Sequence, residues 1–78
     1  MSDDYVKVSL DCLFVYPSGN AFAIRDKDGL RHSIPFSLLH FADERIVKDN
    51  VPRGDGHGLV WRVKVRLRHW KARQLELV

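Results

Sequence analysis

"GLVWRVKVRLRHW", residues 58–70, is the most regular stretch of this 78-residue chain. Every odd position from 59 to 67 is apolar, whereas the even positions from 62 to 68 are cationic. The cations are Arg62, Lys64, Arg66 and Arg68. Successive side chains of a β-strand point to opposite faces, so this alternation predicts a strand with one apolar and one cationic face. Trp61 belongs to the apolar set and is expected in the core.

A long first strand is expected near the N-terminus, because apolar residues alternate from Val6 to Tyr16. Leu13 and Val15 add apolar side chains to its other face. The end of this strand is therefore expected to be bulged or buried on both sides. "PSGN" at 17–20 follows as a turn, since Pro, Gly and Asn favour the backbone angles that turns need.

A hairpin is expected next, formed by strands at 21–26 and 30–35 around an Asp-Gly turn at 27–29. Pro35 has no N–H to donate to a sheet and should end the second of these strands. His32 falls on the same face of its strand as apolar neighbours. We therefore expect a partly buried histidine that forms a hydrogen bond.

The remaining segments are less regular. The spacing of apolar residues in 36–42 suggests a short helix or a 3₁₀ turn, while 44–49 fits either a helix or a short strand. Three glycines and a proline make 51–58 a loop. The alternation breaks after His69, so the chain should change conformation there, and 70–77 is expected to form a last helical turn or a short closing strand.

These elements predict one small domain, residues 1–78, of the all-β or mainly β class. Four or five strands in so short a chain are expected to form an SH3-like or OB-like barrel or roll, because closure removes exposed sheet edges. A short helix near 36–42 and a short C-terminal turn complete the expected fold.

The composition, 45% hydrophobic and 29% charged, is that of an ordinary folded protein. A single cysteine excludes a disulfide within the chain and fits a reducing compartment. The N-terminal residues lack the pattern of a signal peptide, and no apolar run is long enough to span a bilayer. The expected location is the cytoplasm, with no membrane partner.

The cations are unevenly distributed. Residues 59–78 hold six Lys and Arg side chains against Glu76 alone, a net charge of +5. The other 58 residues hold seven cations and nine anions, a net charge of −2. A pole this basic attracts polyanions or acidic protein surfaces.

The hairpin and the C-terminal segment resemble a loose group of small, mostly uncharacterised prokaryotic and phage proteins. The shared features are the Asp-Gly turn, the step Ile34, Pro35, Phe36, Ser37, and the later residues Trp70, Ala72 and Leu75. The resemblance covers about two thirds of the chain. His32 and Phe36 depart from it. The resemblance implies a small β domain of bacterial or mobile-element origin, and it assigns no chemistry to any residue.

The cationic face predicts a nucleic-acid-binding surface without strong sequence preference. Its side chains are spaced by about 6.6 to 6.8 Å, close to the phosphate repeat of an extended single strand. Lys71 and Arg73 would extend the surface, and Trp70 would stack on a base. Arg62→Glu combined with Arg66→Glu is then expected to abolish binding, provided that the row faces solvent. Either DNA or RNA is a possible partner.

Two other interpretations remain. Lys and Arg also protect the solvent face of edge strands from aggregation, which would make the row a purely solvated surface. Alternatively, the chain is a protein-interaction module, or a phage or mobile-element inhibitor, that binds a host protein complex. Its basic face would meet an acidic partner surface, and an exposed strand edge with the 51–58 loop would make the contacts. A homodimer through an edge strand fits either function.

No enzyme, metal site or cofactor is expected. The four histidines lack the close pairing of metal ligands: His32, His40, His57 and His69. Asp55 and His57 share a glycine-rich loop that would not hold a catalytic base in place, and Cys12 has the parity of a buried strand residue.

Overall fold

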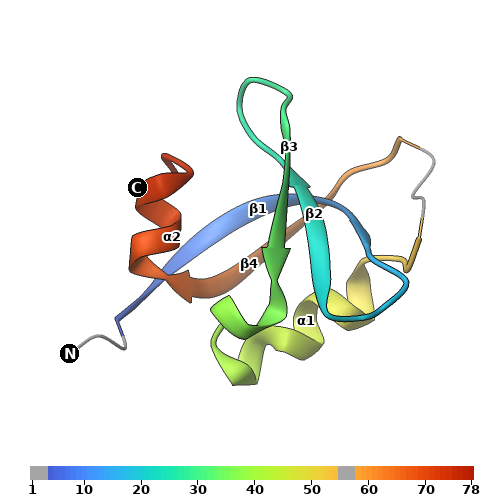
Figure 1. The fold of residues 1–78 in the computed structure, drawn as a ribbon, viewed down its shortest axis with the longest axis horizontal. Helices are drawn as coiled ribbons and strands as arrows, with labels where there is room; N and C mark the ends of the chain where they lie inside the picture. Colours follow the sequence, from blue (N-terminus) through green and yellow to red (C-terminus); the bar gives the residue numbers. More distant parts are fainter. Residues whose placement is uncertain (1–3, 55–57) are drawn as a thin grey trace.

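The computed structural model describes residues 4–54 and 58–78, and these form one antiparallel sheet with short helices packed against it (Figure 1). The strands are β1 (Tyr5–Val15), β2 (Ala21–Arg25), β3 (Arg31–Pro35) and β4 (Trp61–Arg68). Their order in the sheet is β3-β2-β1-β4, so β3 and β4 are the outer strands. The predicted mainly β class is confirmed, and the strand pairing is that of an open four-stranded sheet.

Strand β1 is shared between two partners. Its residues 5–12 pair with β4, and its residues 11–15 pair with β2. The register shifts between Cys12 and Phe14, which confirms the expected bulge. An extra residue reverses the alternation of side chains beyond it. Val15 is consequently buried, whereas the Phe14 ring lies against Tyr16 with 5.1 Å between centroids.

The hairpin of β2 and β3 is held by one aspartate. An oxygen of the Asp26 carboxylate accepts the N–H groups of Asp28 and Leu30 at 2.8 Å, and its other oxygen lies 2.7 Å from Nε2 of His32. Hydrogen bonds from His32 and from the backbone lower the pKa of Asp26. The turn passes through Gly29 at φ 83°, a conformation that favours glycine. The expected hydrogen-bonded, partly buried His32 is confirmed.

Helical segments follow β3 and β4. The segment expected at 36–42 forms two 3₁₀ turns, η1 (Phe36–Leu38) and η2 (Phe41–Asp43). The ambiguous segment after it is helix α1 (Glu44–Asn50) rather than a strand. The chain turns into helix α2 (His69–Gln74) directly after β4, at the residue where the alternation breaks.

The core lies between the apolar face of the sheet and these helices. Alternate residues of β1 and β4 are buried there, and α1 and α2 contribute Val47 and Ala72. Trp61 is half-buried and packs against this core, as expected. Leu59, in contrast, precedes β4 and is 61% exposed. The odd-numbered apolar residues therefore face the core only from position 61 onward.

The outer edge of β4 is partly covered by the segment between η1 and η2. Leu39 forms a bridge with Leu67, and the His40 N–H donates to the carbonyl of Arg66 at 2.9 Å. Strand β4 is therefore an edge strand whose free edge is protected over its C-terminal half. In Figure 1, α2 lies beside the beginning of β1, where the His69 N–H donates to the carbonyl of Asp4.

Candidate nucleic-acid interface

The pairing of β1 with β4 gathers cations on the face of the sheet opposite the core. Paired residues of antiparallel strands share a face. The pairs on this face are Tyr5 with Arg68, Lys7 with Arg66, Ser9 with Lys64, and Asp11 with Arg62. We call the five cations that β1 and β4 place on this face the basic strip: Lys7, Arg62, Lys64, Arg66 and Arg68. The four residues that the sequence predicted on one face thus lie together, and β1 adds a fifth.

Lys7 and Lys64 are the two exposed lysines of the strip. Within residues 4–54 and 58–78, neither takes part in an ion pair. Lys7 stands opposite Arg66, and Lys64 stands opposite the small side chain of Ser9. An ammonium group in this position is hydrated and available to an incoming anion. These lysines are the cations of the strip that are most readily offered to a ligand.

Arg62 is held by its neighbour on β1. Its Nε donates to Oδ1 of Asp11 at 2.9 Å, while 72% of its side chain remains exposed. A guanidinium has five N–H donors in a planar fork, so one bond to a carboxylate leaves others for a second acceptor. Arg62 is thus oriented by Asp11 and still faces solvent.

Arg66 is engaged far more completely. Its Nε and its backbone N–H donate to Oδ2 of Asp43 at 2.9 and 2.8 Å, and its Nη2 donates to Oδ1 at 3.0 Å. Asp43 is 6% exposed, the one charged residue that is buried among those described. The hydrogen bonds from Arg66 lower the pKa of Asp43, and the same bonds raise the pKa of Arg66. Arg66 therefore anchors η2 to the edge of β4 and is not a freely available phosphate ligand.

A run of aromatic rings begins at the end of the strip. The guanidinium carbon of Arg68 lies 4.8 Å from the centroid of the Tyr5 ring. Tyr5 contacts His40 edge to face, with 5.1 Å between centroids, and His40 stacks on Phe41 at 4.7 Å with 24° between the ring planes. We call Tyr5, His40 and Phe41 the aromatic row. Phe41, its last member, is 79% exposed.

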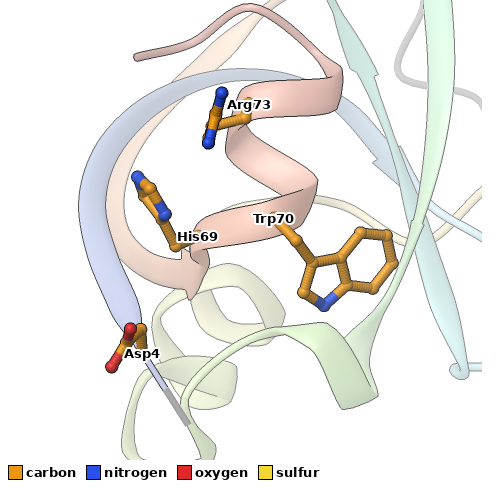
Figure 2. A pocket seen from close by; sticks show the side chains of 4 residues that line it. All are labelled: Asp4, His69, Trp70 and Arg73. Carbon is orange, nitrogen blue, oxygen red and sulfur yellow. The ribbon is translucent and has the colours of Figure 1, made fainter. Parts of the chain in front are cut away.

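The other predicted site residues lie on α2. Asp4, His69, Trp70 and Arg73 line a hollow of about 420 Å³. Figure 2 shows His69 and Arg73 on one side of the helix and the Trp70 indole extending from the other side, away from Asp4. Trp70 is 55% exposed, and Lys71 donates to Gln74 at 2.7 Å with its Nζ 6.0 Å from the Trp70 centroid. These side chains border one hollow without converging on a single point.

The remaining candidates from the sequence are the histidines, the Asp55–His57 pair and Cys12. Residues 4–54 and 58–78 contain no group of three His, Cys, Asp or Glu side chains able to hold a metal ion. Asp55 and His57 lie outside the described residues. Cys12 is fully buried, and burial raises the pKa of its thiol to about 12. No helix of the described chain is long and apolar enough to cross a bilayer.

Sequence reasoning did not identify Lys7, His40, Phe41 or Asp43 as parts of this surface. The alternation along the first strand puts Lys7 on its polar face, and this pattern could have indicated the residue. Its place opposite Arg66, however, depends on the register of β1 with β4. Asp43 reaches Arg66 across 23 positions of the chain, and nothing local marks that pair.

Comparison with protein-family models, with curated proteins and with solved structures finds no match for this chain. The geometry of the basic strip and of the aromatic row is therefore the basis for a functional proposal. A surface of this kind has a recognisable chemistry, because clustered cations beside exposed rings suit a polyanion that also carries planar groups.

Proposed function

We propose that this protein binds nucleic acid through the basic strip, without strong sequence preference and without catalysis. The observation that carries the proposal is the register of β1 with β4, which gathers five cations on the face of the sheet opposite the core. Within the described residues, Asp11 pairs with Arg62 and Asp43 pairs with Arg66. A surface with this excess of positive charge attracts a polyanion and gains free energy by releasing its counterions.

The geometry suits a sugar–phosphate backbone. Alternate residues along one face of β4 are about 6.6 to 6.8 Å apart, a spacing that an extended nucleic-acid backbone can follow. Lys64 and Arg62 would contact successive phosphates, and Lys7 would contact them from β1. Lys and Arg contacts to phosphates fix position and carry no sequence information, so affinity should depend little on sequence.

The fold is compatible with this function. A strand shared between two partners, as β1 is, allows a small sheet to curl towards the SH3-like or OB-like barrels that often bind single strands. The proposal therefore includes an SH3-like or OB-like barrel as the fold and the cytoplasm as the location. Lys71, Arg73 and Trp70 on α2 would extend the surface beyond the end of β4.

The test is fluorescence anisotropy of labelled single-stranded DNA, duplex DNA and RNA at several salt concentrations. The test variant is Lys7→Gln with Lys64→Gln, since neither lysine forms an ion pair within the described chain. Losing two phosphate contacts should lower the slope of log affinity against log salt by about 1.4 for single strands. The matched control is Arg45→Gln with Lys48→Gln on α1, which removes the same charge elsewhere.

Two results would contradict the proposal. One is the absence of binding to any of the three nucleic acids at low salt. The other is an equal loss of affinity in the test and control variants, because net charge alone would then explain the attraction. Retained folding of both variants is checked by thermal unfolding.

A second candidate function is kept because of one specific observation, the position of β3. Within residues 4–54 and 58–78 this strand pairs with β2 alone and is an outer strand of the sheet, so its other edge is a place for strand addition by a partner protein. The partner would be a host complex with an acidic surface, or a second copy of the chain. Part of the loop assigned to this contact, residues 55–57, lies outside the described residues. Stable co-purification with a protein, together with no affinity for nucleic acid, would favour this function.

A further inference from the structure

We infer that the aromatic row makes the surface selective for single strands, with Phe41 as the platform on which an unpaired base stacks. This inference rests on the proposed nucleic-acid binding and adds a residue and a substrate class to it. Phe41 belongs to η2, outside the strand and helix that the sequence marked as basic.

Phe41 has an exposure that its packing does not explain. Its 79% exposure is the highest of any large hydrophobic side chain among the described residues. The buried core contains other residues of this region, such as Phe36 and Leu39, but Phe41 is not part of it. Single exposed apolar residues are common on protein surfaces, but here the ring continues the row of Tyr5 and His40, and contiguous exposed apolar groups are typical of a contact surface.

The ring is nevertheless held in a defined orientation. One side of Phe41 stacks on His40, and His40 in turn contacts Tyr5 in an edge-to-face arrangement. The Nδ1 of His40 accepts the N–H of Ala42 at 3.1 Å, and this bond fixes the imidazole at the start of η2. A platform that is ordered before binding loses little conformational entropy when a ligand stacks on it.

The row is also fastened directly to the basic strip. The His40 N–H donates to the carbonyl of Arg66, and Asp43, at the end of η2, binds the guanidinium of Arg66. At the other end of the row, Arg68 lies over the Tyr5 ring. Strand β4 therefore carries four of the cations on its outward face and holds the segment of His40 and Phe41 at its outer edge. This combination of a cationic track with a stacking platform is the one that binds single strands.

Stacking on Phe41 distinguishes single strands from duplexes. In a duplex the bases are paired and stacked on one another, so their faces are not accessible to a side chain along the helix. The cations of the strip attract both forms, because both carry phosphates. Removal of the Phe41 ring should therefore weaken binding to single strands alone.

The decisive experiment compares single-stranded and duplex DNA of the same length by anisotropy, with the full chain and three variants of Phe41. Phe41→Ala and Phe41→Leu should bind single strands roughly 5- to 150-fold more weakly, as expected for the loss of one base–aromatic stack. Phe41→Tyr should bind like the wild type, because it keeps the ring. Duplex affinity should be unchanged in all three variants.

Two further variants serve as controls. Leu30→Ala removes another exposed apolar side chain, 61% exposed, from the hairpin turn between β2 and β3, and it should leave both affinities unchanged. Trp70→Ala tests a second exposed aromatic ring, on α2. A loss of single-strand affinity in Trp70→Ala but not in Phe41→Ala would overturn the inference and assign the stacking to α2.

The outcomes separate this inference from the proposed function. If Phe41→Ala binds single strands like the wild type while Lys7→Gln with Lys64→Gln weakens binding, the platform is wrong and the basic strip stands. If Phe41→Ala weakens single-strand and duplex binding equally, selectivity is also overturned. If the wild type binds neither form, the proposed function fails and this inference fails with it. Should Phe41→Ala not fold, the comparison of Phe41→Leu with Phe41→Tyr decides.

Discussion

Asp43 is the residue on which the edge of β4 depends. It is nearly buried, and its carboxylate accepts three hydrogen bonds from Arg66, one from the backbone and two from the guanidinium. A buried carboxylate is tolerated in a protein only when it is paired and hydrogen-bonded. The pair therefore explains both the burial of Asp43 and the position of η2 against the sheet.

Asp43→Ala is expected to lower the free energy of unfolding by about 1–3 kcal/mol, because the backbone N–H of Arg66 loses its acceptor at the edge of the sheet. Urea unfolding measures the effect. Asp49→Ala is the control, since among the described residues Asp49 forms only an exposed pair with Arg45 at 4.0 Å and should change stability by less than about 0.5 kcal/mol. Equal effects of the two substitutions would contradict the anchoring role of Asp43.

Acid is expected to destabilise the protein in a defined pH window. The pKa of Asp43 is lowered in the folded chain by hydrogen bonds from Arg66, and that of Asp26 is lowered by hydrogen bonds from His32 and from the backbone. In acid the unfolded state then binds more protons than the folded state. The free energy of unfolding that these two carboxylates contribute is fully present above the unfolded pKa of about 3.9 and is lost as the pH falls through the lower folded values.

Urea unfolding between neutral pH and the acid limit of folding checks this dependence. Asp43→Asn should show a weaker loss of stability on acidification below about pH 4 than the wild type, because one of the two linked carboxyls is gone. An identical pH dependence in both proteins would show that the Asp43–Arg66 pair is not formed in solution.

Cys12 should behave as a buried apolar residue. Its side chain is fully buried in β1, and the raised pKa of about 12 keeps it a thiol at neutral pH. A thiol reagent such as DTNB should therefore react with the native protein only as fast as the chain unfolds, and at once in concentrated urea. Rapid stoichiometric reaction of the native protein would contradict the packing of β1.

Among the elements, the bulge in β1 has the widest consequences. Before it, the residues of even parity are buried, as with Leu10 and Cys12; after it, Val15 is buried and Phe14 is turned to the other face. Because β2 pairs beyond the bulge and β4 pairs before it, this one extra residue lets a single strand serve both partners. Exposed cations continue on the same face beyond the basic strip, because Arg25 of β2 pairs with Asp11 and Arg31 of β3 pairs with Arg25.

The hairpin of β2 and β3 depends on the conformation of Gly29. Its φ is 83°, and a Cβ at this position would have no neighbour within 4 Å, so substitution would be penalised by backbone conformation alone. Gly29→Ala should cost about 1–2 kcal/mol, and Gly29→Asn should cost less because Asn tolerates this region. Urea unfolding of the two variants gives the comparison. A loss in Gly29→Asn as large as that in Gly29→Ala would exclude this explanation.

For the whole molecule, the important property is that the cations of the basic strip have two roles: they make one face strongly positive, and Arg66 among them also stabilises the fold through Asp43. Arg66→Glu would place a carboxylate against Asp43 and destabilise the edge of β4. Loss of binding in Arg62→Glu with Arg66→Glu would therefore mix a binding effect with a folding effect. The exposed lysines of the strip separate the two effects.

We expect Lys7→Gln with Lys64→Gln to unfold at the wild-type temperature, in contrast to the arginine double variant. Thermal unfolding monitored by circular dichroism would show this difference, and equal stability of the two variants would contradict the structural role of Arg66.

The sequence by itself determined the features that depend on neighbouring residues. Alternation of apolar and charged residues predicted β4 and its two faces, Asp-Gly chemistry predicted the hairpin, and parity predicted a hydrogen-bonded His32. These properties follow from side-chain direction, turn sterics and burial, which act over a few residues and can be read in order along the chain.

The tertiary structure alone decided which of these residues meet. It placed Lys7 beside Arg66, buried Asp43 against the same arginine, and aligned Tyr5, His40 and Phe41 at the end of the strip. It also chose helix over strand for α1, because Val47 had a place in the core. The physical reason is that register, bulge position and core packing are set by contacts between segments far apart in the chain, and these contacts override the weak local preferences of each segment.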